Sequence, residues 1–432
     1  MTFFKLMKDL YKIFKQSQGI SIDTRTIKGG ELFFCLKGDR FNGNKYAKKA
    51  LELKAYYVVI DDPEYYVDNG KMLLVDDSLK TLQELSYYHR KQLSCHIIGI
   101  TGTNGKTTTK ELVTEVLSSH LKCISTIGNL NNHIGVPLSL LRITSDSDVA
   151  VIEMGANHPG EIRALCELVS PSHGIITNIG KAHLEGFGSY RNIIDTKIAL
   201  YHKIEKNSGR IFINADDSLL MEKVPEVSLI TYGQKNNTDV TVELLESEGQ
   251  LEFMWESHTI KTQLFGDYNL YNAAAAIAVG ITFGVPSDKI VAALKNYSPS
   301  NNRSQFLKGD NNNLILDAYN ANPESMKQAI VFFEKSKIKQ KTMILGDMFE
   351  LGSFQKEEHQ KILDHIKGSP IKRVFLVGTA FSQFKEEYPQ FRYFEDSNLL
   401  MTYLEINPIK DQQILLKGSR GIGLEVLKDI LL

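Results

Sequence analysis

The chain has 432 residues, which corresponds to about three domains at roughly 150 residues each and excludes a peptide or a small disulfide-stapled scaffold. Its 50 lysines and arginines balance 51 acidic residues, so the net charge gives no reason to expect nucleic acid or an anionic membrane as a partner. The four cysteines form no Cys-x-x-Cys pair, which argues against a zinc site or a disulfide framework and favours the cytoplasm as the location.

The N-terminal region, residues 1–92, is predicted to be a small α/β domain. Lysines interrupt the first 17 residues too often for a membrane span or a secretory signal, and the apolar spacing predicts an amphipathic helix. A second helix is expected from Leu79. Short apolar strands are expected at 31–36, 55–60 and 71–75.

The central region, residues 93–298, changes at Cys95 to a repeating order of strand, glycine-rich turn and helix. This order is typical of a parallel sheet with crossover helices, and we expect the catalytic sheet here. The later elements are strands at 149–152 and 174–177, a meander-like stretch at 228–265, and helices at 272–279 and 287–297.

The C-terminal region, residues 299–432, is predicted to be a Rossmann-like domain. The polar cluster at 298–304 is the best linker candidate, because its serines, amides and single proline bury little apolar surface. Strands separated by helical stretches are expected at 314–316, 342–345, 374–377 and 414–416. The expected fold class is therefore α/β with three domains.

The strongest local signal is HIIGITGTNGKTTTKELVTEVL at 96–117, in which a strand runs into a glycine-rich turn and then a helix. Such a turn points backbone N–H groups at phosphate oxygens, with the positive end of the helix behind them. Lys106 is expected to hold the β- and γ-phosphates of ATP, and Thr107 to ligate magnesium. Ile100 stands where the strict pattern has glycine, so the loop is a variant. The residues expected to bind nucleotide here are Gly102, Thr103, Asn104, Gly105, Lys106, Thr107 and Thr108.

Two neighbouring strands end in residues suited to a metal. Glu153 ends the apolar run DVAVIE, so its carboxylate should lie beside the phosphate loop at the carboxyl edge of the sheet. The next strand is followed by Asn178 and His183 on an irregular turn. Taken singly, such a glutamate is more often a cap and such a histidine structural. On successive strands of one sheet they reinforce each other.

Six motifs, in order along the chain, resemble those of the Mur ligase family. TGTNGKTT is also close to the folylpolyglutamate synthases and indicates the superfamily alone. AHLEGFGS and YNANP favour those members that add D-alanyl-D-alanine to a UDP-N-acetylmuramoyl tripeptide. The motifs are TGTNGKTT (101–108), GNLNNHIGVPLSLL (128–141), EMGANHPGEI (153–162), AHLEGFGS (182–189), YNANP (319–323) and LGDMFELG (345–352).

The resemblance implies an N-terminal domain that binds the UDP substrate, a central ATPase domain and a C-terminal Rossmann-like domain. It also implies that ATP phosphorylates the tripeptide carboxylate, and that the amine of D-alanyl-D-alanine attacks the acyl phosphate to form an amide. Like charge opposes the approach of a carboxylate to a triphosphate, so the site must supply cations and oriented donors. A monomer acting on these two small-molecule substrates is expected.

The resemblance further implies a lysine modified by carbon dioxide, whose carbamate binds a second magnesium ion. Lys197 in IDTKIAL is the matching position. Family members carry an acidic residue shortly after this lysine, whereas Ile198 and Ala199 follow here, so a plain solvated lysine remains an alternative. The expected catalytic residues are Lys106, Glu153, His183 and Lys197, and the expected metal ligands are Thr107, Glu153, His183 and Lys197.

The resemblance also implies contacts to the rest of the nucleotide. Asn269 and Asn272 in GDYNLYN match residues that meet the adenine, although simple helix capping is an alternative. Arg303 and Asp317 match residues that reach the phosphates and ribose from the third domain, and Asn302 stands where the family has glycine. Closure of that domain would exclude water from the acyl phosphate.

Two further segments resemble substrate-binding stretches. Residues 21–38 match the uridine-binding segment, although Asn-Gly-Asn at 42–44 replaces an Asp-Gly-His run. In the third domain, LLKGSRG at 415–421 carries Lys417 and Arg420, which could meet a carboxylate or simply be solvated. The expected substrate residues are Asp23, Thr24, Arg25 and Gly38 for uridine, and Asn320 and Asn322 for the amine.

Two alternatives stay open. One is a sister ligase, either another Mur step or a folylpolyglutamate synthase, which incubation with each candidate amine would distinguish. The other is a nucleotide-dependent switch or binding protein, in which loss of Lys197 would leave nucleotide turnover intact. Lysine and diaminopimelate are both compatible with the motifs as the third residue of the peptide.

Overall fold

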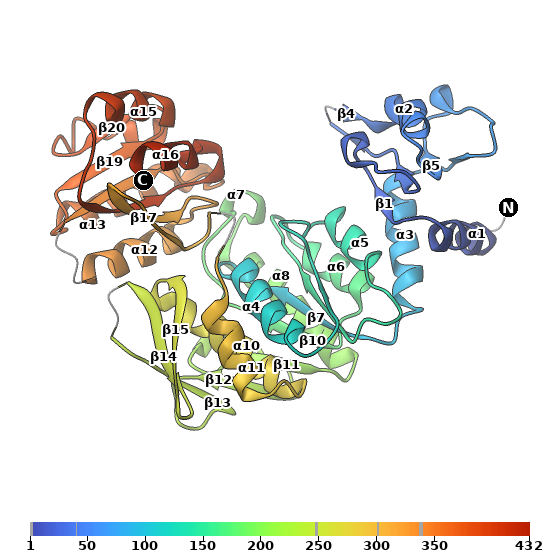
Figure 1. The fold of residues 1–432 in the computed structure, drawn as a ribbon, viewed down its shortest axis with the longest axis horizontal. Helices are drawn as coiled ribbons and strands as arrows, with labels where there is room; N and C mark the ends of the chain where they lie inside the picture. The colour runs from blue at the N-terminus through green and yellow to red at the C-terminus, as the bar shows by residue number, and fades with distance from the viewer. Residues whose placement is uncertain (1–2, 40, 247–248, 300–301, 337–339) are drawn as a thin grey trace.

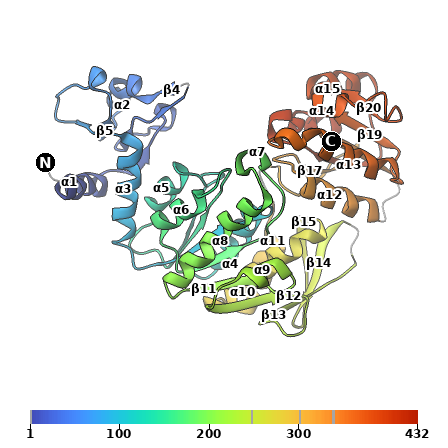
Figure 2. The same cartoon turned by 180° about the vertical axis from the view of Figure 1, so that it is seen from behind.

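The computed structural model describes residues 3–432 except 40, 247–248, 300–301 and 337–339. The N-terminal elements lie at one end of the long axis, the phosphate-loop region in the middle and the C-terminal elements at the other end (Figures 1 and 2). The α/β fold class is confirmed. The domain boundaries at 92 and 298 stay predictions, and the linker candidate at 298–304 includes residues 300–301, which lie outside the described residues.

The N-terminal elements form a four-stranded parallel sheet, and the predicted strands are present but shorter than expected. The side chain of Asp77 accepts a hydrogen bond from Lys80 N (2.8 Å) and so starts the helix α3. The elements are α1 (Phe3–Gln16), β1 (Ile20–Ser21), β2 (Leu32–Phe34), β3 (Lys37–Gly38), β4 (Phe41–Asn42), α2 (Ala47–Glu52), β5 (Tyr57–Ile60), β6 (Met72–Leu74) and α3 (Ser78–Arg90).

Helix α3 joins the N-terminal sheet to the central region through a shared apolar cluster. Leu82 and Leu85 of α3 belong to the same buried cluster as Leu141, which directly follows α5 (Gly135–Leu140). The Arg90 guanidinium also donates hydrogen bonds to the carbonyl oxygens of Val169 (2.9 Å) and Ser170 (3.2 Å), at the end of α6 (Glu161–Val169). These contacts hold the first sheet against the central one.

The central parallel sheet has the strand order β12-β11-β10-β7-β9-β8. The phosphate-loop strand β7 therefore lies between β9, which ends in Glu153, and β10, which leads to Asn178 and His183. The strands are β7 (His96–Thr101), β8 (Cys123–Ser125), β9 (Val149–Glu153), β10 (His173–Ile176), β11 (Arg210–Asn214) and β12 (Ser228–Gly233).

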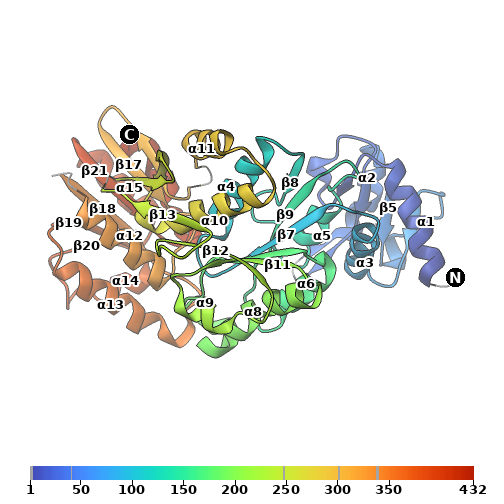
Figure 3. The ribbon, with the colours of Figure 1, turned by 90° about the horizontal axis from the view of Figure 1, so that it is seen from below.

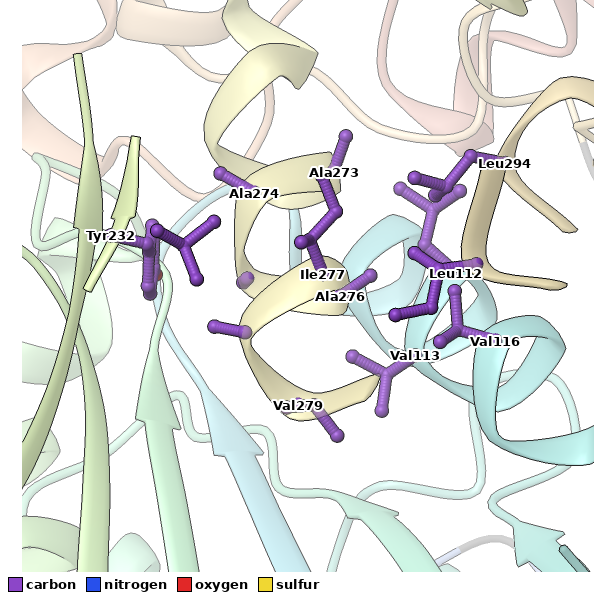
Figure 4. Packing of buried hydrophobic residues seen from close by; sticks show 14 of the residues in the cluster. Leu112, Val113, Val116, Tyr232, Ala273, Ala274, Ala276, Ile277, Val279 and Leu294 are labelled. Carbon is purple, nitrogen blue, oxygen red and sulfur yellow. The ribbon is translucent and has the colours of Figure 1, made fainter. Parts of the chain in front are cut away.

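Helices cover both faces of this sheet, as a parallel sheet requires. Figure 3 shows α4, α10 and α11 on one face, and α6, α8 and α9 on the other. The alanine-rich stretch of α10 packs against Val113 and Val116 of α4 (Figure 4), and small side chains let the two helices approach closely. This packing fixes the start of α4, where the phosphate loop ends. The bounds are α4 (Lys106–Ser118), α8 (Tyr190–Lys206), α9 (Ser218–Lys223), α10 (Leu270–Thr282) and α11 (Ser287–Asn296).

The predicted meander begins later than expected. Strand β12 pairs in parallel with β11, so the prediction was wrong for residues 228–233. Helix α9 connects β11 to β12, and such a crossover gives parallel pairing. The antiparallel meander consists of β13 (Val240–Leu244), β14 (Gln250–Trp255) and β15 (His258–Phe265).

The C-terminal elements form a second parallel sheet, with apolar clusters on both of its faces and β16 antiparallel at its edge. Pairing of Leu264 with Gln305 links β15 to β16, so the two sheets run together as fifteen strands. The strands are β16 (Gln305–Lys308), β17 (Asn312–Asp317), β18 (Lys341–Gly346), β19 (Arg373–Val377), β20 (Arg392–Phe394) and β21 (Gln412–Lys417). The longer helices are α12 (Pro323–Lys335), α13 (Gln355–Lys367) and α15 (Ser397–Ile406).

Within the described residues, no helix combines the length and the apolar character needed to cross a membrane. The four cysteines are all free thiols.

Candidate active site

A cavity of about 1270 Å³ surrounds the phosphate loop. Its walls come from the loops that follow β7, β9 and β10, from the start of α10, and from the segment that leads from β17 into α12. It therefore opens where the carboxyl ends of the central strands face the C-terminal elements, the usual ligand position in such sheets.

Two glycines shape the phosphate loop. Gly102 and Gly105 have φ angles of 149° and 79°, a region that favours glycine. A Cβ atom at Gly102 would also lie 1.9 Å from Thr177 Oγ1. The loop is braced by the segment after β10, since Asn104 N donates to Asn178 Oδ1 (2.9 Å). The loop is therefore a rigid turn held against β10.

Two lysines converge on this loop. Nζ of Lys106 donates to the carbonyl oxygens of Gly102 and Thr103 (both 2.9 Å), and Nζ of Lys197 from α8 donates to the same Gly102 carbonyl (2.9 Å). Burial, and then the charge of Lys106, lowers the pKa of Lys197 well below its usual value. The alternative of a solvated Lys197 was wrong, because the residue is 3% exposed.

Positive charge is crowded at this point. Burial lowers the pKa of Lys106; the Glu153 carboxylate opposes that shift, whereas the Arg303 charge adds to it. Lys106 and Arg303 line the cavity, whereas Lys197 lies behind the loop and is not among the lining residues. Cationic side chains around N–H groups at a helix start suit a polyanion such as a triphosphate.

Glu153 lies at the end of β9 with one carboxylate oxygen unpaired. Its Oε1 accepts a hydrogen bond from Asn131 Nδ2 (2.7 Å), while the buried Oε2 has no partner among the described residues. A buried carboxylate oxygen without a partner is costly and suits a cation. Thr107 is buried at the start of α4 and lines the same cavity. Asn131 lies within the GNLNNHIG motif, which was the signal that could have found it.

The described residues contain no group of three or more histidine, cysteine, aspartate or glutamate side chains that could hold a metal by themselves. Magnesium typically takes one or two protein ligands and completes its shell with phosphate and water oxygens. Glu153 and Thr107 fit that arrangement.

His183 is engaged by the C-terminal domain. Its Nδ1 contacts the Glu350 carboxylate, and this interaction lowers the pKa of Glu350. His183 directly precedes the short helix α7 (Leu184–Phe187), and its backbone has a left-handed φ of 52°. Glu350 belongs to the LGDMFELG motif but was not predicted as a site residue, since nothing local indicates a partner 167 positions away in the chain.

Asn269 and Asn272 are buried and tie α10 to α4. Asn272 accepts a hydrogen bond from Thr109 Oγ1 (2.9 Å) and donates to Asn269 Oδ1 (2.8 Å), and Asn269 Nδ2 donates to Phe265 O (2.7 Å). The side chain of Asn269 makes no capping bond to the helix, so the capping alternative was wrong for it. Both residues line the cavity, and their adenine role stays a prediction.

Arg303 and Asp317 lie together at the C-terminal side of the cavity. The Arg303 guanidinium lies 3.5 Å from the ring centre of Tyr319, and its buried Nε has no partner among the described residues. Asp317 accepts from Ser304 N (3.1 Å) and from Lys417 Nζ (2.6 Å). Asn302 has a φ of 57°, in the left-handed region that glycine and asparagine adopt most readily. This conformation explains why related sequences have glycine at this position and why asparagine can replace it.

The YNANP segment touches the phosphate loop. Asn322 Nδ2 donates to Asn104 Oδ1 (2.7 Å), and Asn104 Nδ2 reaches Glu324 Oε2 (3.4 Å). Asn322 also caps α12 by accepting a hydrogen bond from Ser325 N. Asn320 is exposed at the cavity wall. Glu324 was missed by the sequence reasoning, since a glutamate in the first turn of a helix is common.

The predicted uridine residues lie away from this cavity. Asp23, Thr24, Arg25 and Gly38 are described residues, and none of them lines it. Asp23 and Arg25 form an exposed ion pair (2.6 Å). Within the Asn-Gly-Asn run, Asn44 is fully buried and donates to Asp61 Oδ1 (2.8 Å). The run therefore has a structural role, and the uridine contacts stay predictions.

The Mur ligase family models match the chain in three parts. The Mur ligase family catalytic domain matches residues 16–87, the Mur ligase middle domain 100–280, and the Mur ligase glutamate ligase domain 302–420. The UDP-N-acetylmuramoyl-tripeptide--D-alanyl-D-alanine ligase of Bacillus subtilis strain 168 is 34% identical, over 96% of this chain and 93% of its own length. The chain belongs to the Mur ligase family.

Further relatives of this Mur ligase also match nearly the full length of the chain. The ligase of the same name from Escherichia coli K12 is 33% identical over 94% of this chain and 92% of its own. A crystal structure of MurF from Acinetobacter baumannii aligns with a TM-score of 0.85, at 28% identity and 98% coverage of both chains. MurF ligase from Thermotoga maritima, solved in complex with ADP, aligns with a TM-score of 0.84, at 25% identity and 97% coverage of both chains.

Proposed function

We propose that this Mur ligase joins D-alanyl-D-alanine to UDP-N-acetylmuramoyl tripeptide in the synthesis of peptidoglycan precursors. ATP is converted to ADP and phosphate in the reaction. The observation that carries this proposal is the near full-length similarity to ligases of that name. The cavity supports it, because cations, backbone donors and an unpaired carboxylate oxygen surround a phosphate loop.

In the first step the tripeptide carboxylate attacks the γ-phosphoryl group of ATP, giving an acyl phosphate and ADP. Lys106 leaves the Gly102 and Thr103 carbonyls and donates to the β- and γ-phosphates instead. Arg303, whose Nε has no partner among the described residues, neutralises charge from the opposite wall. These donors offset the repulsion between the carboxylate and the triphosphate.

In the second step the neutral amine of D-alanyl-D-alanine attacks the acyl carbon. A tetrahedral adduct forms, loses a proton and expels phosphate, leaving the new amide. The YNANP segment holds the amine substrate through Asn320 and Asn322, which line the cavity near the phosphate loop. Closure of the C-terminal domain excludes water from the acyl phosphate.

Magnesium supplies charge neutralisation of the phosphate oxygens when bound. Thr107 and the free Oε2 of Glu153 would hold the first ion, and His183 and Lys197 the second. Lys197 suits conversion to a carbamate, because burial lowers its pKa and so favours the neutral amine, the form that attacks carbon dioxide. The products are a lysine carbamate and a proton.

The remaining assignments belong to the same proposal. Asn269 and Asn272 contact the adenine, Asp317 the ribose, and Asp23, Thr24, Arg25 and Gly38 the uridine. The enzyme acts as a cytoplasmic monomer, a location in keeping with its free cysteines.

A phosphate-release assay tests the proposal. Purified protein is incubated with ATP, magnesium and UDP-N-acetylmuramoyl tripeptide, with and without D-alanyl-D-alanine. We expect steady turnover that requires all four components, with the pentapeptide product detected by mass spectrometry. Turnover that ignores the dipeptide, or that prefers glutamate or another amino acid in its place, would contradict the assignment.

The carbamate at Lys197 has its own test. Protein equilibrated with ¹³C-bicarbonate should show a carbamate ¹³C resonance that is absent from Lys197→Met. Lys203, on the same helix but paired with Glu167 at the surface, provides the control Lys203→Met, which should keep the signal. A wild-type spectrum without the resonance would remove the carbamate from the proposal.

A further inference from the structure

The end of β21 and the loop that follows it carry two basic side chains, Lys417 and Arg420, and the structure separates their roles. Lys417 is buried and pairs with Asp317 at 2.6 Å, so its charge is already neutralised. Arg420 is exposed, and its guanidinium makes no hydrogen bond or ion pair within the described part of the chain. Arg420 is therefore the basic residue of this loop that can accept an anionic ligand.

The position of Arg420 is fixed by contacts of its own loop. The neighbouring Ser419 is buried, its N–H donates to Asp347 O (3.0 Å), and its Oγ accepts a hydrogen bond from Phe349 N (2.9 Å). A Cβ atom at Gly418 would lie 2.9 Å from Gly346 Cα, so the loop packs tightly on β18. Because the backbone is already fixed, a ligand that binds Arg420 does not have to order the loop as well.

Tyr319 connects Arg420 to the cavity. This tyrosine lines the cavity at the start of the YNANP segment, and the Arg420 guanidinium lies 5.4 Å from its ring centre. Arg303 lies over the same ring at 3.5 Å. Because the Arg420 guanidinium contacts Tyr319 through the face of the aromatic ring, its N–H groups stay free to donate to a planar acceptor such as a carboxylate.

The proposed amine substrate has a carboxylate at its other end. Lys417 is the one lysine or arginine among the described residues from 305 onward that line the cavity, and it is already paired with Asp317. On the basis of the proposed function, we propose that Arg420 binds the C-terminal carboxylate of D-alanyl-D-alanine and so selects the free dipeptide acid. The fork of the guanidinium matches a carboxylate with two parallel hydrogen bonds.

The test measures KM for three substrates in wild type, Arg420→Ala and Arg420→Lys. We expect Arg420→Ala to raise KM for D-alanyl-D-alanine about 100-fold, as loss of a charged partner typically does. KM for ATP and for the UDP substrate should change less than about two-fold. Arg420→Lys should be intermediate, because it keeps the charge and loses the fork.

A second substrate makes the test specific for the carboxylate. D-alanyl-D-alanine amide lacks the negative charge, so wild type should discriminate against it strongly and Arg420→Ala should treat acid and amide almost alike. Arg392→Ala is the matched control, since Arg392 is an exposed arginine near another tyrosine ring, Tyr403, at 5.3 Å. It should behave as wild type.

Each outcome is decisive for the inference. Undiminished discrimination between acid and amide in Arg420→Ala would overturn it. A parallel rise in all three KM values would assign Arg420 a structural role and would also overturn it. Absence of turnover in wild type would instead contradict the proposed function, which separates the two failures.

Discussion

Unpaired or crowded charges surround the phosphate loop. Glu153 has a buried oxygen without a partner, Arg303 a buried Nε without one, and Lys106 and Lys197 donate to a single carbonyl oxygen. Unsatisfied buried groups cost free energy and, in native structures, mark places where a ligand supplies the missing partner. Under the proposed function, a nucleotide and its metal ion would satisfy them.

Glu153→Gln tests this reading at a single residue. The substitution keeps the size of the side chain and an oxygen for Asn131 Nδ2, but removes the charge facing Lys106. We expect kcat to fall by about 100-fold or more, while the thermal unfolding midpoint changes little. Activity near that of wild type would mean that Glu153 does not support the phosphoryl transfer.

Asn302 provides a test of backbone conformation. Its φ of 57° costs most residues about 1 kcal/mol, and asparagine and glycine tolerate it best. Asn302→Ala should therefore lower the stability of the C-terminal elements by about 1 kcal/mol, and Asn302→Gly by less than about 0.5 kcal/mol. Chemical denaturation followed by circular dichroism measures both. Equal loss in the two variants would show that the asparagine side chain, rather than the backbone, is what matters.

At the scale of elements, α12 docks beside the phosphate loop because one position lacks a side chain. A Cβ atom at Gly180 would lie 1.7 Å from Glu324 Oε2. The resulting space lets the first turn of α12 reach Asn104 through Asn322 and Glu324. Burial, and then the charge of Asp217, raises the pKa of Glu324.

A double-mutant cycle tests this docking. Gly180→Ala should displace the Glu324 carboxylate from Asn104 and lower kcat/KM about five-fold, a coupling of about 1 kcal/mol. Glu324→Ala removes the clash, so adding Gly180→Ala to it should have almost no further effect. Additive losses in the double variant would show that the two residues act independently.

At the scale of the whole molecule, the joints on the two sides of the central domain differ in character. The N-terminal sheet shares an apolar cluster with the central region through Leu82, Leu85 and Leu141. The C-terminal domain touches the cavity through polar contacts, while a ring contact between Phe265 and Phe332 (4.8 Å) lies at the junction of β15 with β16. Phe265 also belongs to the buried apolar cluster of the C-terminal sheet. Polar contacts exchange with water more readily than buried apolar ones, so we expect the contacts at the cavity to break first if this joint opens.

Glu350→Ala tests that joint. Loss of the contact with His183 should shift the protein to more open forms, seen as a larger radius of gyration in small-angle scattering. Glu357→Ala is the control, because Glu357 pairs with Lys361 on the surface of the same domain. Identical scattering of wild type and both variants would show that Glu350 does not hold the domains together.

A half-buried histidine, His173, lies at the start of β10 on the amino-end edge of the central sheet and affects acid stability. Burial, with smaller contributions from His96 and Arg210, lowers the pKa of His173 from 6.5 to about 4. Between about pH 6.5 and about pH 4 the unfolded chain therefore binds a proton at His173 that the native protein does not bind. The free energy of unfolding falls as the pH drops through this range, by up to about 3 kcal/mol. His173→Phe keeps the ring stacked on Phe212 and should shift acid unfolding to lower pH. His202→Phe, at an exposed position, should not; equal midpoints for His173→Phe and wild type would exclude this role.

The sequence by itself determined the features that depend on local order. Residues 96–117 predicted strand, loop and helix correctly, because glycine positions and apolar spacing act within a few residues. The placement of Glu153 at a strand end was also predicted, since strand register follows from the apolar run. The α/β class followed from the repetition of such units along the chain.

Only the tertiary structure decided which distant side chains meet. His183 and Glu350, Asn104 and Asn322, and Lys417 and Asp317 pair across 100 or more positions, and no local pattern encodes a partner. The same holds for parallel pairing of β12, which depends on where α9 crosses the sheet. The electrostatic environment of the lysines is likewise a tertiary property. Lys197 becomes buried, and Lys417 forms its ion pair with Asp317, only when the elements pack together.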